Sequence, residues 1–226
     1  MALIELRNVT KEYRAEGVPV VALRGIDLEV DAGEFIALAG KSGCGKSTLL
    51  NLCGAMDFPS SGEVILDGQS TSTLNDAKLT RVRREKVGFI FQSFQLLHTL
   101  TAIENVELPL MLAGRRDARA AARERLRWVE MEEYAGRFPH QLSGGQQQRV
   151  AVARALVHNP RIILADEPTG NLDSATGEVI LKLLRQTARE LSMTVLMATH
   201  SAESAAYAGR TIHLRDGRLD AVLAVR

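Results

Sequence analysis

The sequence has few cysteines, few aromatic residues and almost no excess of either charge. It contains two cysteines in 226 residues, 4% aromatic residues and a formal net charge of +1 at pH 7. Cys44 and Cys53 have no metal-ligand spacing, and so few cysteines fit a reducing, cytosolic compartment better than a disulfide framework. The near-neutral charge argues against the broad basic surface with which proteins bind nucleic acid. The length allows one large domain or two small ones.

Long apolar runs are also missing. No run approaches the ~18 residues that a membrane-spanning helix needs, and the longest, such as residues 161–165, suit strands. Residues 2–7 alternate apolar and polar like a strand and lack the apolar core of a signal peptide. We therefore expect that, if the protein serves a membrane, it does so from the cytoplasmic face through a partner.

What the sequence does have is a glycine-rich loop between a strand-like run and a helix-like run, at residues 35–39 and 49–52. Its glycines would let backbone N–H groups approach phosphate oxygens at the start of a helix. Lys46 would reach the β- and γ-phosphates, and the Ser47 hydroxyl would bind Mg²⁺. This order predicts a phosphate-binding P-loop rather than an ordinary glycine turn. The residues expected to contact the nucleotide are Gly40, Lys41, Ser42, Gly43, Cys44, Gly45, Lys46, Ser47 and Thr48.

Two adjacent carboxylates follow another apolar run. Residues 162–165 read Ile-Ile-Leu-Ala and precede Asp166 and Glu167. Successive side chains of a strand point in opposite directions, but at the strand's end the chain turns, so both acids can face a nucleotide. We predict that Asp166 binds Mg²⁺ through water and that Glu167 polarises the attacking water as a general base. The alternative, an acidic turn without a catalytic role, is disfavoured by the upstream P-loop.

A second candidate for anion binding opens a later helix. Ser143, Gly144, Gly145 and Gln146 follow Leu142, and their backbone N–H groups would lie at a helix N-terminus. An ordinary serine cap with flexible glycines is the alternative. Because one nucleotide rarely needs two such helix ends from one subunit, we hypothesise a head-to-tail dimer. Each ATP would lie between the P-loop of one subunit and the Ser143 loop of the other.

Hydrophobic periodicity separates an α/β core from a helical insertion. Alternation predicts strands at residues 3–9 and 21–30 around a loop containing Gly17 and Pro19. Between residues 92 and 143 there is no convincing strand pattern, so we expect a helical subdomain there. Further strands are expected at 35–39, 63–67, 87–91, 162–165 and 194–198, a hairpin at 212–222, and helices at 76–84, 115–129, 145–157 and 175–191.

Together these motifs resemble the ATP-binding cassette of ABC transporters. The resemblance covers essentially the whole chain, and the runs LSGGQ and LADEP are highly specific. It implies an α/β fold: a P-loop NTPase, RecA-like core with an N-terminal antiparallel β subdomain and an inserted α-helical subdomain. The whole chain, residues 1–226, would be a single domain, with core segments at about 1–91 and 146–226 and the helical subdomain at about 92–145. The matching positions, in order, are residues 40–48, Gln92, residues 142–146, Asp166, Glu167, Leu172, Asp173 and His200.

The same resemblance implies roles that the residues alone do not. Tyr13 matches an aromatic that stacks on adenine, although without the match a packed surface tyrosine would be favoured. Gln92 matches a glutamine that joins the core to the helical subdomain and reaches Mg²⁺ and the attacking water. Asp173 matches the acid of a loop that crosses the dimer interface, and His200 matches a histidine that contacts the γ-phosphate. A lone histidine is more often structural, but the position of His200 after the last core strand favours the functional role.

The resemblance also implies cofactors and partners, which are ATP, Mg²⁺, a second copy of the chain and an integral membrane permease. The permease would hold the chain at the inner face of the cell membrane, and no nucleic acid is expected. Residues 89–97, 100–110 and 170–173 resemble the lipoprotein-releasing and macrolide-export group of bacterial ATPases. Lys41 departs from the usual proline, and Cys44 from the common serine. Cys44 is either a reactive thiol at a helix N-terminus or an inert small residue shielded by nucleotide.

The leading hypothesis is an ATPase subunit that powers a separate permease of the lipoprotein-release or export type through ATP-driven dimerisation. Phe94, Leu96, Leu97 and Leu100 would receive a permease helix, or else form the core of the helical subdomain. A cell-division regulator, whose permease-like partner transports nothing, fits the same residues. A soluble cassette ATPase acting on DNA or ribosomes fits less well, because the chain has neither a long coiled-coil insertion nor a second cassette.

Overall fold

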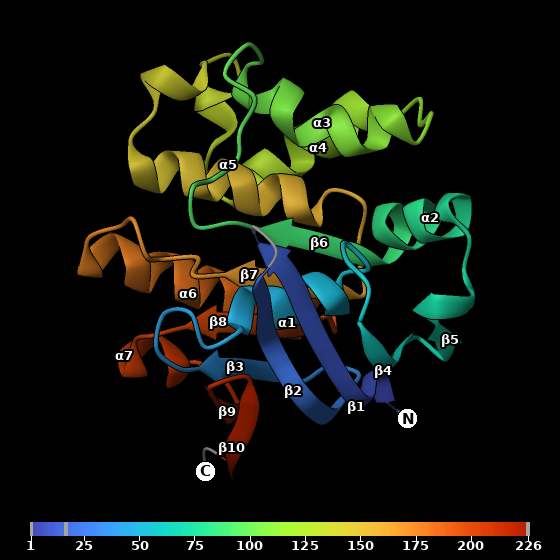
Figure 1. The fold of residues 1–226 in the computed structure, drawn as a ribbon. Helices are drawn as coiled ribbons and strands as arrows, with labels where there is room; N and C mark the ends of the chain where they lie inside the picture. Colours follow the sequence, from blue (N-terminus) through green and yellow to red (C-terminus); the bar gives the residue numbers. More distant parts are fainter. Residues whose placement is uncertain (1, 16–17, 225–226) are drawn as a thin grey trace.

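Two β-sheets lie at the centre of the molecule, and a layer of helices covers one end of them (Figure 1). The computed structural model describes residues 2–15 and 18–224. The chain starts in an antiparallel sheet, passes through strand β3 (Phe35–Ala39) and helix α1 (Lys46–Cys53), and ends in a hairpin of the central sheet. The predicted α/β fold is confirmed.

The antiparallel sheet has the strand order β2-β1-β4-β5. The strands are β1 (Ala2–Ala15), β2 (Val18–Asp31), β4 (Ser61–Leu66) and β5 (Gln69–Ser70). The strands expected at 3–9 and 21–30 lie inside β1 and β2, but the loop expected around Pro19 is wrong, because Pro19 pairs with Arg14 within the hairpin. β2 is an edge strand, and edge positions tolerate a residue without an N–H. Gly17, the other residue of that expected loop, lies outside the described residues.

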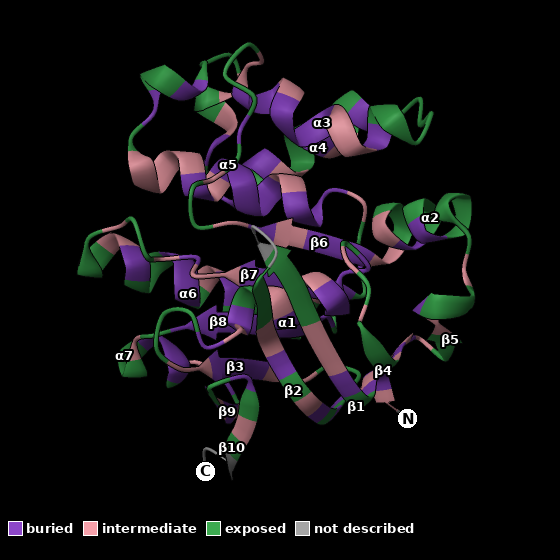
Figure 2. Cartoon of the chain, viewed as in Figure 1, coloured by how far each residue is buried: buried purple, intermediate pink, exposed green. Residues whose placement is uncertain are grey.

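The central sheet has the order β10-β9-β3-β8-β7-β6, and β10 alone among these strands runs antiparallel to its neighbour. Its strands β7 and β8 are buried along almost their whole length (Figure 2), as expected of parallel strands covered on both faces. The remaining strands are β6 (Val87–Ile90), β7 (Ile162–Asp166), β8 (Thr194–Thr199), β9 (Arg210–Arg215) and β10 (Arg218–Ala224).

The two faces of the central sheet pack into separate hydrophobic clusters. Leu196 of β8 packs with Leu49 of α1 and with the antiparallel sheet. Its neighbour Val195 points to the other face, as alternation along a strand requires, and packs in the cluster of the large helices. Those helices are α5 (Gly144–Leu156) and α6 (Ser174–Glu190), and the short α7 (Ala202–Ala205) contacts β3 and β8.

The helical layer is built on α5. This helix packs against α3 (Ala102–Leu112) and α4 (Ala118–Trp128) on one side, and against β6 and α6 on the other. The helix predicted at 115–129 corresponds to α4. Helix α3 lies within the region expected to be helical, but no bounds were predicted for it, since it contains a proline and its many apolar residues give no one-sided stripe. The remaining helical segments are α2 (Asp76–Lys86), η1 (Thr71–Thr73), η2 (Glu132–Tyr134) and η3 (Pro139–Gln141).

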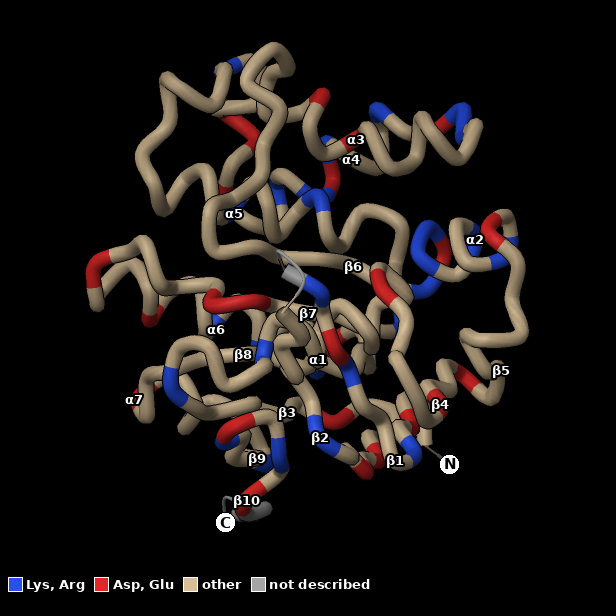
Figure 3. Tube along the Cα trace, in the orientation of Figure 1, with Lys and Arg blue, Asp and Glu red and all other residues tan. Residues whose placement is uncertain are grey.

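Charged residues of both signs are interspersed along the trace, and Lys and Arg are dense on α2 (Figure 3). Within the described part of the chain, no helix is both long enough and apolar enough to cross a bilayer.

Candidate functional site

The carboxyl ends of four parallel strands meet at one edge of the central sheet. Ala39 pairs with Thr199, Asp166 with Ala198, and Ile90 with Ala165. The residues that follow these ends therefore converge, as is usual where parallel sheets bind ligands. A hollow at this edge is lined by Gly40, Lys41, Ser42, Gln92, Glu167 and His200, together with residues of α7 and β9.

The glycine loop keeps its shape for two different reasons. A Cβ on Gly40 would lie 2.3 Å from the Leu214 carbonyl oxygen, and one on Gly45 would lie 2.7 Å from the Ala22 carbonyl oxygen. Gly43 has open space around it but a φ of +78°, which favours glycine. Packing against β2 and β9 thus restricts Gly40 and Gly45, and a positive φ favours glycine at Gly43 and also at Gly45, where φ is +109°.

Lys46 lies inside the loop that it belongs to. Its Nζ donates to the backbone oxygens of Gly40 at 2.7 Å and Lys41 at 3.1 Å, and it lies 3.7 Å from a Glu167 carboxylate oxygen. Only 6% of the residue is exposed. The ammonium charge is therefore fixed between the glycine loop and the acid that follows β7.

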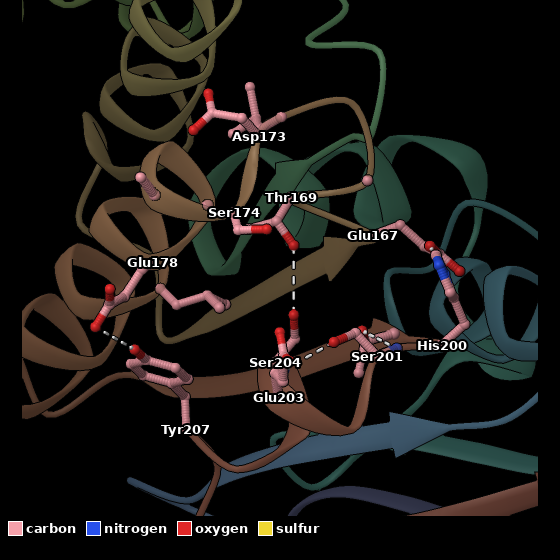
Figure 4. Close-up of a pocket in the computed structure, with 16 residues that line it drawn as sticks. Glu167, Thr169, Asp173, Ser174, Glu178, His200, Ser201, Glu203, Ser204 and Tyr207 are labelled. Atoms are coloured by element: carbon pink, nitrogen blue, oxygen red, sulfur yellow. Dashed lines mark hydrogen bonds and ion pairs between the residues drawn. The ribbon is translucent and has the colours of Figure 1, made fainter.

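Glu167 and His200 form the centre of the hollow. The His200 ring nitrogen Nδ1 is hydrogen-bonded to Glu167 Oε2, and Figure 4 shows the two side chains pointing toward one another. The Glu167 backbone has a φ of +47°, a conformation that costs a non-glycine residue about 1–3 kcal/mol. Its N–H donates to Ala198 on β8 at 3.0 Å, which helps to hold that conformation. The ring of His200 remains 61% exposed, so it is open to a ligand in the hollow.

Asp166 and Gln92 supply oxygens beside this pair. Asp166 Oδ1 is buried and has no hydrogen-bond partner among the described residues, so it fits a cation-binding or water-binding atom. Gln92 is held by Asn171, whose Nδ2 donates to the Gln92 carbonyl at 3.0 Å, while Gln92 Nε2 donates to Asn171 Oδ1 at 3.4 Å. A Cβ on Gly170 would lie 2.7 Å from Gln92 Nε2, so a larger residue there would displace the Gln92 side chain. The contribution of Asn171 could not be deduced from spacing alone.

The first turn of α5 lies elsewhere. Ser143 caps the helix, because its Oγ accepts from the Gln146 N–H at 3.3 Å and its own N–H donates to Gln146 Oε1 at 2.9 Å. A Cβ on Gly145 would meet Thr176 Cγ2 at 2.4 Å, whereas one on Gly144 would find ordinary contacts at 3.5 Å or more. Among the described residues that line the hollow, none comes from this turn.

Asp173 is also outside the hollow, at the start of α6. It caps that helix by accepting from the Thr176 N–H at 3.0 Å and hydroxyl at 2.6 Å, and these hydrogen bonds lower the pKa of Asp173. Its carboxylate borders a neighbouring cavity that Glu167 and His200 border too, although it lies apart from that pair in Figure 4.

Tyr13 lies on β1, and its phenol is fixed at the loop that follows α1. The hydroxyl donates to Asp57 Oδ2 at 2.9 Å. Partial burial and this hydrogen bond raise the pKa of Tyr13, while a hydrogen bond with Thr48 acts in the opposite direction. The ring is therefore positioned beside the helix that begins with Lys46. Lys11 and Asp57, which surround the phenol, carry no sequence motif.

Cys44 points into the protein rather than into the hollow. The residue is 7% exposed and packs in the cluster of α1 and the antiparallel sheet. Its Sγ would lie 2.7 Å from a Cβ on Gly40. This placement favours the inert small residue over a reactive thiol. The second cysteine, Cys53, is fully enclosed, and burial raises its pKa to about 12.

Two polar residues of α5 that sequence reasoning missed reach the loops around the hollow. Gln148 is fully buried and its Nε2 donates to the Pro168 carbonyl at 2.7 Å, directly after Glu167. The Arg154 guanidinium donates to the carbonyls of Phe94 and Gln95, which follow Gln92 and both have a positive φ. Their only sequence signal is a polar residue inside an otherwise apolar helix face.

Comparison with known proteins gives consistent matches over most of the chain. A family model described as "ABC transporter" matches residues 23–170. The chain is 49% identical over 224 residues to the uncharacterised ABC transporter ATP-binding protein MJ0796 of Methanocaldococcus jannaschii, covering 96% of this chain and 95% of the relative. It is 46% identical to the lipoprotein-releasing system ATP-binding protein LolD of Geobacter metallireducens, covering 96% and 98%. It is 47% identical to the macrolide export ATP-binding/permease protein MacB of Wolinella succinogenes, covering 96% of this chain but 34% of the relative.

A solved structure agrees with these sequence matches. The dimeric structure of MJ0796 in a post-hydrolysis state, bound to ADP and Pi, superimposes with a TM-score of 0.92 at 46% identity and covers 99% of both chains.

Proposed function

The chain belongs to the ABC transporter family, and on that premise we propose that it is the ATP-hydrolysing subunit of a transporter whose membrane permease is a separate protein. The convergence of the glycine loop, Gln92, Glu167 and His200 on one hollow carries the proposal. It supplies a phosphate-binding loop and a general base in the arrangement that phosphoryl transfer to water needs.

Each residue has a distinct role in this proposal. Lys46 binds the β- and γ-phosphates, and Glu167 takes a proton from the attacking water. His200 holds the Glu167 carboxylate through its hydrogen bond and contacts the γ-phosphate. Ser47, Asp166 and Gln92 would hold Mg²⁺, and the buried, unpartnered Oδ1 of Asp166 fits that use. When bound, Mg²⁺ would neutralise charge on the transferred phosphoryl group.

A second copy completes each site. The first turn of α5 presents Ser143, Gly144 and Gly145 at a helix N-terminus, which attracts anions, but this turn does not line the hollow of its own chain. The dimeric state of the MJ0796 structure supports the same arrangement here. ATP can close such a dimer only because it binds the closed state more tightly than the open one.

The permease contact is assigned to the segment between β6 and α3. Leu97 is 47% exposed there, whereas Leu96 is buried, so the segment presents part of its apolar surface outward. The relatives named for lipoprotein release and macrolide export favour a permease of that type. Through this partner the chain would lie at the inner face of the membrane.

Mixed dimers test the shared sites. Lys46→Ala removes the phosphate-binding charge from one half-site, and Gly144→Asp places a negative charge in the other, at a position where a Cβ makes only ordinary contacts. If sites are shared head to tail, mixing the two variants restores one intact site and hence ATP hydrolysis above that of either variant alone. Lys46→Ala mixed with Glu167→Gln is the matched control, because two defects in the same half cannot complement. Activity no higher in the first mixture than in the control contradicts head-to-tail sharing.

Capture of the partner tests the transporter assignment. A photo-crosslinking residue in place of Leu97, in cells that produce the full chain, should recover an integral membrane protein. The matched control is the same residue in place of Val179, an exposed position on α6. Recovery of ribosomes or nucleic acid from Leu97 would overturn the transporter assignment. A recovered permease-like protein without transport activity would favour the cell-division role.

A further inference from the structure

Lys11, Tyr13 and Asp57 form a closed set of contacts next to the proposed ATP site. Lys11 Nζ donates to Asp57 Oδ1 at 2.6 Å and to the Phe58 carbonyl at 2.7 Å, and it lies 4.9 Å from the centroid of the Tyr13 ring. The Tyr13 hydroxyl donates to the other Asp57 oxygen. Each member is thus held by both of the others.

The set has the properties of a permanent ion pair rather than a loose surface contact. The Lys11 side chain is only 11% exposed, and two of the three ammonium donors are used. Partial burial alone would raise the pKa of Asp57, but hydrogen bonds from Lys11, from the Phe58 N–H and from Tyr13 outweigh it, so that pKa lies below its usual value. Asp57 therefore stays ionised and accepts from Lys11 and Tyr13 at neutral pH.

Lys11 covers one face of the Tyr13 ring, and the rest of the ring and the neighbouring Val20 are exposed to solvent. The Lys11 ammonium lies over the ring, where a cation is attracted to the π-electrons. Tyr13 is still 38% exposed, and Val20, its cross-strand partner, is 51% exposed. Paired residues of adjacent strands share a face of the sheet. An apolar platform therefore lies uncovered beside the helix that starts with Lys46.

We propose that Lys11 and Asp57 are positioning residues that hold the Tyr13 ring as a one-sided stacking platform for the base of the nucleotide. The inference rests on the proposed function, because it requires ATP at the glycine loop. The ring is fixed in place before the nucleotide arrives, so less rotamer freedom is lost on binding. The phenol is engaged by Asp57 and Thr48, so the contribution of Tyr13 to base binding is stacking rather than hydrogen bonding.

The test compares two ligands by isothermal titration calorimetry, ATP and inorganic tripolyphosphate, which has no base. Tyr13→Ala should raise the Kd for ATP by roughly 5- to 100-fold, the range that base stacking on an aromatic supplies. Lys11→Met and Asp57→Asn should each raise it by about 3- to 10-fold, a part of the loss seen without the ring. None of the three should change the Kd for tripolyphosphate. Lys11→Arg, which keeps the positive charge, should retain most of the ATP affinity of the unaltered chain.

Lys86→Met is the matched control, because Lys86 also forms an ion pair with an aspartate, Asp67, at 2.7 Å, but this pair does not contact Tyr13. It should change neither Kd. If Lys11→Met or Asp57→Asn weakens both ligands equally, or weakens neither, the positioning role is wrong while the ATP site stands. If the unaltered chain binds neither ligand, the proposed function itself fails.

Discussion

The edge of the central sheet and the first turn of α5 both offer backbone N–H groups to an anion, yet they are built differently. At the sheet edge, Glu167 already contacts both Lys46 and His200. At the start of α5, the side chains of Ser143 and Gln146 each accept from the other residue's backbone N–H, as in an ordinary capping box. In the proposed function, the first region carries the catalytic groups of its own chain, whereas the second would act only at the phosphate of a nucleotide bound by another copy.

The two regions are nevertheless joined mechanically. Helix α5 starts at the second region, and farther along it Gln148 and Arg154 bind the loops that follow Glu167 and Gln92 in the first. A displacement of α5 would therefore reach both loops. In the proposed dimer, one helix would therefore contribute to the partner's site at its start and to its own chain's site along its length.

The largest effect is expected from removing the charge at the sheet edge. Glu167→Gln should lower kcat for ATP hydrolysis by at least about 100-fold, as expected when a general base is lost. ATP binding should persist, because Lys46 and the glycine loop are unchanged. Phosphate release and equilibrium binding measure the two properties, and size-exclusion chromatography with ATP should show an accumulated dimer. Turnover equal to that of the unaltered chain would rule out Glu167 as the base.

The next effect separates the two regions most directly. Gly144→Asp should lower hydrolysis by about 100-fold, since like charges brought together cost several kcal/mol. It should leave ATP binding to the monomer unchanged, because Gly144 does not line the hollow of its own chain. ATP binding is measured at protein concentrations too low for the chain to dimerise. A large loss of monomer binding would mean that the α5 turn serves its own chain's site.

A smaller, purely structural effect distinguishes the two neighbouring glycines of that turn. Gly145→Ala should reduce the free energy of unfolding by about 1–3 kcal/mol through overpacking against Thr176. Gly144→Ala has room for its methyl group and should stabilise the helix by about 0.5–1 kcal/mol. Urea unfolding of both variants gives the comparison. Equal free energies of unfolding would show that α6 does not pack closely on the start of α5.

The smallest effect concerns the far end of α5. His158 Nε2 donates to the Val87 carbonyl oxygen at 3.1 Å, and burial lowers the pKa of His158 from its usual value of 6.5. The unfolded chain therefore binds the proton first, and stability is lost as pH falls through about 6.5, by at most about 1.4 kcal/mol per pH unit. His158→Gln should remove this part of the pH dependence between pH 7 and 5, measured by urea unfolding. An identical pH slope in both proteins would contradict it.

Much of the site could be predicted because its signals are local. Residues 40–48 and the pair Asp166 and Glu167 are defined by short spacings next to apolar runs, and the structure places both at the ends of buried strands. The prediction of a loop at Pro19 was wrong, because an edge strand can contain a proline, a residue that is otherwise typical of turns. Helix α3 lies inside the predicted helical subdomain, but its bounds were not predicted, because its exposed residues Met111 and Leu112 are apolar too and blur the one-sided pattern that identifies amphipathic helices.

The sequence by itself determined the phosphate-binding loop, the two acids, the α/β class and the presence of a second helix end with anion-binding glycines. Only the tertiary structure decided which of these face one another. Strand order brought Gln92, Glu167 and His200 together at one hollow. Tertiary contacts also placed Lys11 and Asp57 beside Tyr13, and joined α5 by hydrogen bonds to the loops that follow β6 and β7. The physical reason is that spacing along a chain controls local conformation, whereas contacts between distant residues depend on sheet register and helix packing, which no single segment encodes.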